Sequence, residues 1–344
     1  MKNSYVSDLR DGARVDDFFL ICSKSLGHTQ DGSPYVRLKL GDRTGTIDAI
    51  KWDASETMYS GLSGDDFVWV RGTVSTYNEK LQIKIDSFRR YTDKADPADF
   101  LPRSERDIDE MLSEMLAIVA SVRHPHLREL LDSFFGDQEL LSKFSTAPAA
   151  QKIHHGYIGG LLEHSLSVAK MSDLAASHYP RVDRDLLVTG AILHDIGKIE
   201  EFCWDKSIKY SNTGHLVGHI VTGALMVEKA AERINGFHPL LKLTLMHMIL
   251  AHHGQKDWGS PKRPKSIESL VLHYIEDLDA KVNTFQQAVG APEAGDEADL
   301  FTDRHWLFER PLFKGLPRSV MRPWDDQPEP SEPSEADHDP FAEE

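Results

Sequence analysis

The chain has 344 residues, of which 40% are hydrophobic and 27% charged, and its formal net charge is −16. This length accommodates two domains, and the composition is that of a globular protein rather than a disordered or fibrous one. The first residues lack the apolar core of a secretion signal, no apolar run is long enough to span a bilayer, and the two cysteines form no disulfide framework. We therefore expect a cytoplasmic protein with no membrane partner.

The negative charge is concentrated near the C-terminus. Residues 291–344 carry 5 basic and 15 acidic side chains, whereas residues 1–95 carry 14 of each. The acidity of the whole chain therefore does not exclude a nucleic-acid partner for the remainder, where bound metals would also add local positive charge. The final segment, residues 317–344, is rich in Pro, Asp, Glu and Ser and is predicted to be a disordered acidic tail.

Residues 1–92 show the pattern of a small β-barrel. Short runs of alternating apolar and polar residues are separated by turns rich in Gly, Asp and Pro, which predicts strands joined by tight connections. The strands are expected at residues 15–25, 35–40, 46–52, 67–76 and 81–88. A helical segment at residues 55–62 precedes the fourth strand. Five strands with such a helix are typical of an OB-fold.

An OB barrel binds single-stranded nucleic acid through basic side chains and stacking aromatics on one face. The candidates on the predicted strands and turns are Tyr35, Arg37, Lys39, Trp52, Tyr77, Lys80 and Lys84. Any one of them could instead cover the barrel rim or fill the core. The barrel as a unit is better support for nucleic-acid binding than any single side chain, although a fold alone does not establish a function.

A polar, proline-containing linker is predicted at residues 93–102. Apolar residues then recur at helical spacing within residues 103–316, which predicts an all-α domain without further strands. Its helices are expected at residues 103–122, 127–135, 139–144, 154–169, 185–199, 240–251 and 266–289, with one more beginning near residue 214. The predicted fold class is multidomain α+β, a small five-stranded OB-type β-barrel followed by an all-α helical bundle.

The helical region holds a series of histidines around the pair His194-Asp195, which lies in an apolar run. A buried charge is costly unless it is paired or bound to metal, and imidazole and carboxylate are ligands that divalent transition metals prefer. The other candidates are single histidines, a His-His pair and a late carboxylate: His164, His219, His252, His253 and Glu276 or Asp279. Each histidine alone would more often be an ordinary core or surface residue. Together they can close around two metals bridged by Asp195, because facing helices of a bundle supply inward ligands.

One further histidine of this region has no assigned role. His215 lies at i,i+4 spacing from His219, which places both on one face of the helix predicted to begin near residue 214. It could be a cap, a substrate contact or a partner of a metal ligand.

This ordered set resembles the HD superfamily of metal-dependent phosphohydrolases, and in more detail the YhaM-type 3′→5′ exoribonucleases, which join an OB-fold to an HD domain. The resemblance covers about residues 5–315. It is carried by residues 154–165, 194–198, 214–220, 252–254, 258–264 and 272–281. It implies that the metal ligands are His164, His194, Asp195, His219, His252, His253 and Glu276. Glu276 stands where an Asp is expected in the family, so Asp279, on the same face of the predicted helix, is the alternative ligand or a partner of one.

Two divalent ions in such a site would lower the pKa of a bridging water and bind the phosphodiester oxygens, so no protein nucleophile is required. The predicted catalytic residues are Asp195, as the bridging ligand, and Lys198, which neutralises charge on the phosphate unless it is only a solvated lysine at a helix end. The histidine-rich shell favours manganese over magnesium, with iron, cobalt or nickel as alternatives.

Two other segments are candidates for substrate contacts. Lys262 and Arg263 lie in a Gly/Pro-rich loop and could hold a nucleic-acid backbone or simply be solvated. His154, His155 and Tyr157 could contact substrate or pack the start of the helix that carries His164.

The favoured prediction is a metal-dependent 3′→5′ exoribonuclease, a hydrolase whose barrel grips single-stranded RNA; the direction comes from the resemblance alone. Single-stranded DNA as a substrate and a homo-oligomeric state are left open. One alternative is an HD phosphohydrolase acting on free or cyclic nucleotides, which would not need a polymer-binding barrel. The other is a nucleic-acid-binding protein with an inactive HD site, against which the near-complete set of ligands argues.

Overall fold

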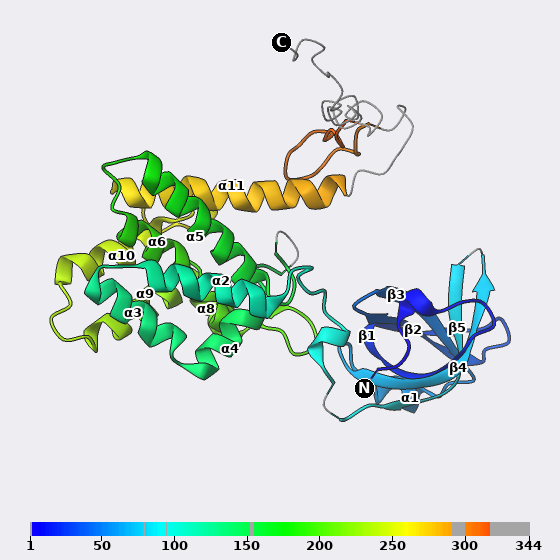
Figure 1. Cartoon of the computed structure of the whole chain (residues 1–344). Coiled ribbons are helices and arrows are strands. Elements are labelled where there is room, and N and C mark those ends of the chain that lie inside the picture. Colours follow the sequence, from blue (N-terminus) through cyan, green and yellow to red (C-terminus); the bar gives the residue numbers. More distant parts are fainter. Residues whose placement is uncertain (1, 79, 94, 152–154, 291–299, 317–344) are drawn as a thin grey trace, which may run out of the picture. The chain divides into compact units, whose positions relative to one another are not determined.

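The computed structural model describes residues 2–78, 80–93, 95–151, 155–290 and 300–316. Its N-terminal strands close into a barrel (Figure 1). They are β1 (Arg14–His28), β2 (Pro34–Asp42), β3 (Gly45–Trp52), β4 (Phe67–Tyr77) and β5 (Lys80–Arg90). The order around the barrel is β1-β2-β3-β5-β4, and all neighbours are antiparallel except β3 and β5. A short helix, α1 (Glu56–Ser60), precedes β4. The predicted five-stranded OB-type barrel is confirmed.

Period-two alternation explains why these segments form the barrel. In β2, Leu38 and Leu40 are fully buried while Lys39 between them is exposed, because successive side chains of a strand point to opposite faces. β1 spans fifteen residues and carries a bulge between Ile21 and Ser23. A bulge bends a strand, which allows β1 to pair with β2 through one half and with β4 through the other.

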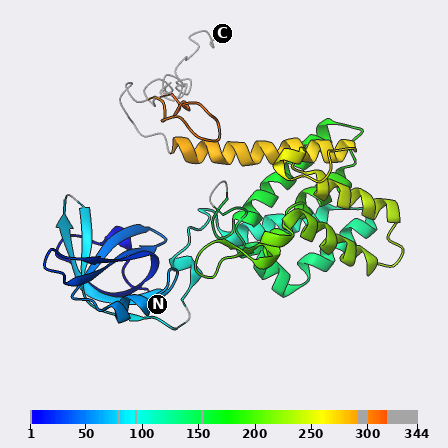
Figure 2. The same ribbon diagram turned by 180° about the vertical axis from the view of Figure 1, so that it is seen from behind.

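Ten α-helices follow the barrel within the described part of the chain (Figures 1 and 2). They are α2 (Ile108–Ser121), α3 (Pro125–Phe135), α4 (Gln138–Thr146), α5 (Gly160–His178), α6 (Arg184–Leu193), α7 (Lys198–Glu201), α8 (Asn212–Leu216), α9 (His219–Glu232), α10 (Pro239–Ala251) and α11 (Ile267–Val289). Several begin at a polar N-cap whose side chain accepts a backbone N–H, as Asp107, Asp137 and Asp183 do. The prediction of a helical domain after the barrel is confirmed.

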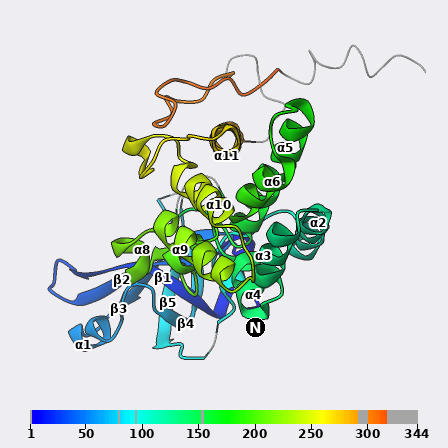
Figure 3. The ribbon, with the colours of Figure 1, turned by 90° about the vertical axis from the view of Figure 1, so that its left-hand side faces the viewer.

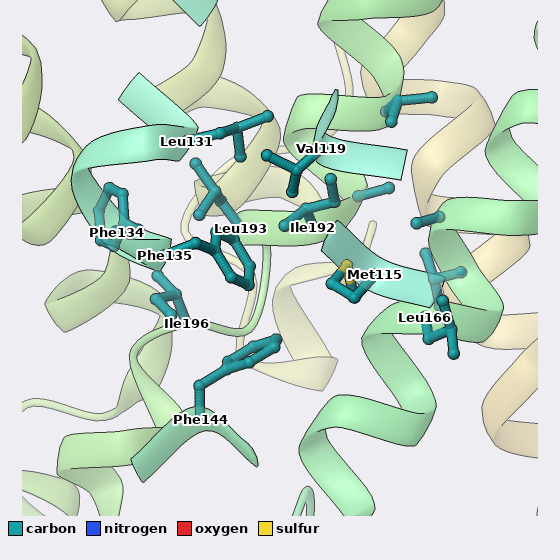
Figure 4. Close-up of a cluster of buried hydrophobic side chains, with 14 of the residues drawn as sticks. Met115, Val119, Leu131, Phe134, Phe135, Phe144, Leu166, Ile192, Leu193 and Ile196 are labelled. Carbon is teal, nitrogen blue, oxygen red and sulfur yellow. The ribbon is translucent and has the colours of Figure 1, made fainter. Parts of the chain in front are cut away.

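The helices pack around one apolar core. Met115, Phe144, Leu166 and Ile192, from four different helices, are fully buried there (Figure 4). All residues of α6 from Leu187 to Leu193 are buried, so this helix runs through the interior rather than along the surface. Its C-terminal end therefore delivers the following residues into the core.

The single helix expected at residues 185–199 is wrong. α6 ends at Leu193, and α7 begins only at Lys198. Between them the backbone tightens to i→i+3 hydrogen bonds, such as Lys198 N–H to the Asp195 carbonyl at 2.9 Å. Gly197 lies directly against α9, because a Cβ there would be 2.1 Å from the His219 carbonyl oxygen. This close approach requires glycine.

The helix predicted to carry both His215 and His219 on one face is also wrong. His215 belongs to α8 and His219 is the first residue of α9, and Gly218 with a φ of +78° separates the two helices. The helix expected from residue 154 begins at Gly160 instead, and His154 lies outside the described residues. In each case the spacing of the residues predicted a continuous helix, and a bend in the backbone interrupts it.

Two further strands lie within the helical domain, where none was predicted. β6 (Phe202–Cys203) and β7 (Lys209–Tyr210) form an antiparallel pair. Strands of two residues are too short to show alternation in the sequence.

The chain divides into two compact units, residues 1–281 and 282–344. In the described part of the second unit, isolated bridges join Phe301 to Phe313 and His305 to Arg310. The predicted tail, residues 317–344, lies outside the described residues. Among the helices of the described chain, none combines the length and the apolar character that crossing a bilayer demands.

Candidate metal centre

The proposed ligands come from four helices and the turns that follow them. His164 lies in the second turn of α5, and His194 and Asp195 follow the end of α6. His219 opens α9, whereas His252 and His253 follow the end of α10. Figure 3 shows α5, α6 and α10 from a side on which α11 is seen nearly along its axis. The structure thus brings together six side chains that span ninety positions of the sequence.

Asp195 lies between two groups of histidines. Its Oδ2 is 3.5 Å from His164 Nε2 and 3.4 Å from His194 Nε2. Its Oδ1 is 3.4 Å from His219 Nε2 and 3.5 Å from His252 Nε2. Two ligand atoms that are each about 2.1 Å from one ion, at an angle of about 90–110°, lie about 3.0–3.4 Å apart. One carboxylate oxygen therefore faces each of two potential metal positions.

Several of these buried atoms have no hydrogen-bond partner among the described residues. They are both carboxylate oxygens of Asp195, Nε2 of His219 and Nε2 of His252. The ammonium of Lys198 lies 2.6 Å from Asp195 Oδ2, as an ion pair whose angles are not those of a hydrogen bond. Burying unsatisfied polar atoms is costly. Metal ions at the two positions would satisfy all four atoms, so the residues present fit divalent metals.

Each histidine of the cluster is anchored through its other ring nitrogen. Nδ1 of His194 donates to the Ala191 carbonyl at 2.7 Å, and Nδ1 of His252 donates to the Ile249 carbonyl at 2.7 Å. The remaining anchors are Asp279 Oδ2 for His164 at 2.7 Å, Glu201 Oε1 for His219 at 2.9 Å and the Trp258 carbonyl for His253 at 2.8 Å. Such bonds fix the tautomer and the ring orientation of metal-binding histidines. The Nε2 atoms of His164 and His194 lie 3.1 Å apart, and those of His219 and His252 have no hydrogen-bond partner among the described residues.

Glu201 contacts a proposed ligand and was not predicted from the sequence. Its Oε1 accepts hydrogen bonds from both the backbone N–H and Nδ1 of His219, each at 2.9 Å. The Glu201 side chain is buried, and His219 holds its pKa below the ordinary value although burial opposes this. Its place beside His219 depends on the chain reversal through β6 and β7, so no local signal could have identified it.

Asp279 and Glu276 have different surroundings. Asp279 accepts hydrogen bonds from His164 Nδ1 at 2.7 Å, His155 Nε2 at 3.2 Å and the Ser167 hydroxyl, so both of its oxygens have protein partners. Asp279 therefore orients His164. Glu276 belongs to none of the ligand-sized clusters that the described residues form. Burial raises the pKa of Glu276 to about 7, and its ligand role stays a prediction.

The pKa values of three histidines suit metal binding, whereas the pKa of His194 is raised, because the neighbouring Asp195 carboxylate outweighs the effect of burial. Burial lowers the pKa of His164 and of His253 to about 4, and the pKa of His252 lies well below its usual value for the same reason. These imidazoles are neutral at pH 7, as ligation requires. Burial opposes the charged form of Asp195 too, but Lys198 and the neighbouring histidines outweigh it and hold the pKa of this carboxyl well below its ordinary range.

The nucleic-acid candidates on the barrel share its outer face. Tyr35 pairs with Trp52 across β2 and β3, with ring centroids 5.1 Å apart. Arg37 and Lys39 are exposed on β2, and Tyr77 is 66% exposed at the end of β4. A surface groove on this face is lined by Arg37, Asp48, Ile50, Tyr77, Asn78, Lys80, Leu81 and Gln82. Aromatic rings beside a basic groove are the surface that single strands require.

The predicted loop residues Lys262 and Arg263 are exposed between α10 and α11. The Lys262 N–H donates to the Leu250 carbonyl of α10 at 3.4 Å. The loop thus returns to the helix that ends at the histidine pair, and its basic side chains remain free for solvent or a ligand.

The chain matches two domain families, and it is similar to curated relatives over most of its length. The HD domain family matches residues 161–281, and the OB-fold nucleic acid binding domain matches residues 20–91. The 3′-5′ exoribonuclease YhaM of Geobacillus sp. (strain WCH70) is 35% identical over 313 residues, covering 90% of this chain and 94% of the relative. The 3′-5′ exoribonuclease YhaM of Bacillus subtilis (strain 168) is 33% identical, covering 88% and 96%.

Solved structures are similar to about a quarter of the chain. The second OB-fold domain of replication protein A from Methanococcus maripaludis covers 27% of this chain and 99% of its own, at 21% identity and a TM-score of 0.22. The single-stranded DNA binding protein from Thermus aquaticus covers 24% and 42%, at 19% identity and a TM-score of 0.22.

Proposed function

The chain belongs to the family of the YhaM 3′-5′ exoribonucleases, and from this premise we propose that it removes nucleotides from the 3′ end of single-stranded RNA by metal-dependent hydrolysis. One observation carries the proposal. Asp195 presents one oxygen to His164 and His194 and the other to His219 and His252, which is the arrangement of a carboxylate shared by two ions.

The HD domain is a divalent-metal domain, and we assign the ligands as follows. One position would be held by His164, His194 and Asp195, and the other by Asp195, His219, His252 and His253, with Glu276 as a further ligand. When bound, the ions would activate a water and hold the phosphate oxygens. We expect manganese, with iron, cobalt or nickel as alternatives, rather than magnesium, because magnesium prefers oxygen ligands and most ligands of this site are imidazoles.

The side chains of the chain itself supply charge and orientation. The Lys198 ammonium, 2.6 Å from Asp195 Oδ2, would neutralise charge that develops on the phosphate. Glu201 and Asp279 orient His219 and His164, which keeps both imidazoles aimed at the site without reorganisation during the reaction.

The barrel face would hold the RNA strand upstream of the cleaved bond. Tyr35, Trp52 and Tyr77 offer stacking surfaces, and Arg37 and Lys39 offer charge to the backbone. Lys262 and Arg263 would contact backbone phosphates. The free cysteines Cys22 and Cys203 fit the reducing cytoplasm as the place of action.

The test uses end-labelled single-stranded RNA, manganese and the variants Asp195→Asn and Asp132→Asn. Asp132 is an exposed carboxylate that pairs with Arg128 on α3, so it controls for the loss of one charge. We expect stepwise 3′ shortening by the wild type and by Asp132→Asn, and none by Asp195→Asn. Hydrolysis of free or cyclic nucleotides with RNA left intact would refute the proposal. Tight RNA binding without turnover in any divalent metal would refute it as well.

A further inference from the structure

Trp258, whose indole is exposed to solvent, is bonded through its backbone carbonyl to the proposed ligand His253. The carbonyl of Trp258 accepts the Nδ1–H of His253 at 2.8 Å, yet Trp258 is 49% exposed. Its ring also contacts His273, with centroids 6.2 Å apart, and His273 Nδ1 donates to the His252 carbonyl at 2.8 Å. Trp258 is thus connected to both histidines of the His252-His253 pair while its ring remains open to a ligand.

The loop that carries this indole is held by backbone bonds. The Gln255 carbonyl accepts the N–H of Trp258 at 3.2 Å and that of Ser260 at 3.1 Å. Gly259, with a φ of +88°, makes the turn between them. The buried Ser260 hydroxyl donates to the Leu250 carbonyl at 2.9 Å. None of these bonds uses the indole, so the side chain can be replaced without removing what holds the loop.

Three lysines lie around the indole, together with the exposed carboxylate of the neighbouring Asp257. The Lys281 ammonium lies 5.5 Å from the ring centroid and also pairs with Asp277 at 2.6 Å. Lys256 and Lys262 are exposed in the same loop. An exposed aromatic face with a cation on it and lysines around it suits a ligand that combines a planar ring with negative charge. A nucleotide has both.

We propose that Trp258 stacks on the base of a nucleotide next to the phosphate that is cleaved, and that Lys281 lies near its backbone. This inference rests on the proposed exoribonuclease function. Every base offers a π-face, so stacking holds the 3′ end in register without selecting its sequence. Removal of successive nucleotides of any sequence requires that tolerance.

The test is a double-mutant cycle between the protein and the RNA. Wild type, Trp258→Ala and Trp258→Phe are assayed on single-stranded RNA whose terminal or penultimate nucleotide is intact or abasic. In the wild type, loss of the stacked base should raise KM about tenfold, and Trp258→Ala should raise KM on intact RNA by the same factor. Trp258→Ala assayed on abasic RNA should show no further rise in KM. Trp258→Phe should raise KM on intact RNA less than Trp258→Ala does.

A matched control separates stacking from general loss of an aromatic side chain. Tyr179 is 51% exposed just after α5, and fifteen residues of helix place it about 22 Å from His164. Tyr179→Ala should behave as the wild type. Manganese content, measured by elemental analysis, should be unchanged in every variant.

Each other outcome decides against the inference. If the abasic substitution and Trp258→Ala multiply each other's effects at both positions, Trp258 does not stack on those bases. If Trp258→Ala loses manganese in proportion to activity, then Trp258 holds His253 in place and does not bind the substrate. If the wild type does not shorten intact RNA at all, the proposed function itself fails. That result is distinct from the two outcomes above, in which the enzyme is active but Trp258 does not stack on the base.

Discussion

Replacing Glu201 by glutamine is expected to weaken metal binding by about 10- to 100-fold, the usual effect of losing a hydrogen-bond partner of a ligating histidine. One oxygen of Glu201 accepts two bonds from His219, each 2.9 Å long. Bonds to a charged acceptor contribute about 1.5–3 kcal/mol, and neutral ones about 0.5–1.5 kcal/mol. Neutralising the acceptor while keeping its shape therefore costs about 1–3 kcal/mol, which corresponds to the same range of affinity.

The assay is a competition for manganese between the protein and a chelator of known affinity, with the metal-free protein prepared by dialysis. Glu200→Gln is the matched control, because it makes the same change at the preceding residue. That side chain is exposed, and within the described part of the chain its ion-pair partner is Lys143, at 3.6 Å. We expect the wild-type affinity for Glu200→Gln and the reduced affinity for Glu201→Gln. Thermal denaturation of the metal-free forms would show how far each variant changes folding.

Two results would refute this reasoning. Glu201→Gln with wild-type manganese affinity would mean that the backbone alone holds His219 in place. A loss of thermal stability in the metal-free protein as large as the loss in metal binding would mean that Glu201 serves folding rather than the metal site.

Two further predictions concern pH and the barrel. Metal-free protein should lose stability as pH falls from 7 to 4, because His164, His252 and His253, whose pKa values lie below the ordinary value when folded, bind protons first in the unfolded chain. Glu276, whose pKa is raised to about 7, binds its proton first in the folded protein and so offsets the effect of one histidine. Denaturant unfolding curves at three pH values would measure the decrease in the free energy of unfolding. A stability that does not change with pH would contradict the prediction. Tyr77→Ala, which removes a 66% exposed ring, should weaken binding of single-stranded RNA about tenfold but leave hydrolysis of a nucleotide p-nitrophenyl ester unchanged. Equal loss on both substrates would count against a role in strand binding.

Local pattern was enough to predict the strands and most of the helices. Leu38, Lys39 and Leu40 alternate as a half-buried strand must, and the five strands were placed within a few residues of their ends. The helix break at residues 194–197 was not predictable, since it depends on hydrogen bonds and on the contact between Gly197 and α9. The strands β6 and β7 could not be predicted, because a strand of two residues shows no periodicity in the sequence.

The residue pattern was sufficient to identify the chemistry of the centre, because imidazoles and a carboxylate inside apolar segments are costly to bury unless they are paired or bound to metal. Tertiary structure alone decided how that chemistry is arranged. It placed the two oxygens of Asp195 toward different histidines. It also showed that Asp279 is hydrogen-bonded to His164, whereas Glu276 belongs to none of the ligand-sized clusters of the described residues. It also brought Glu201 to His219. The reason is physical: spacing along a chain reports which face of a helix a residue occupies, whereas the partner of each ring nitrogen depends on which helix packs against that face.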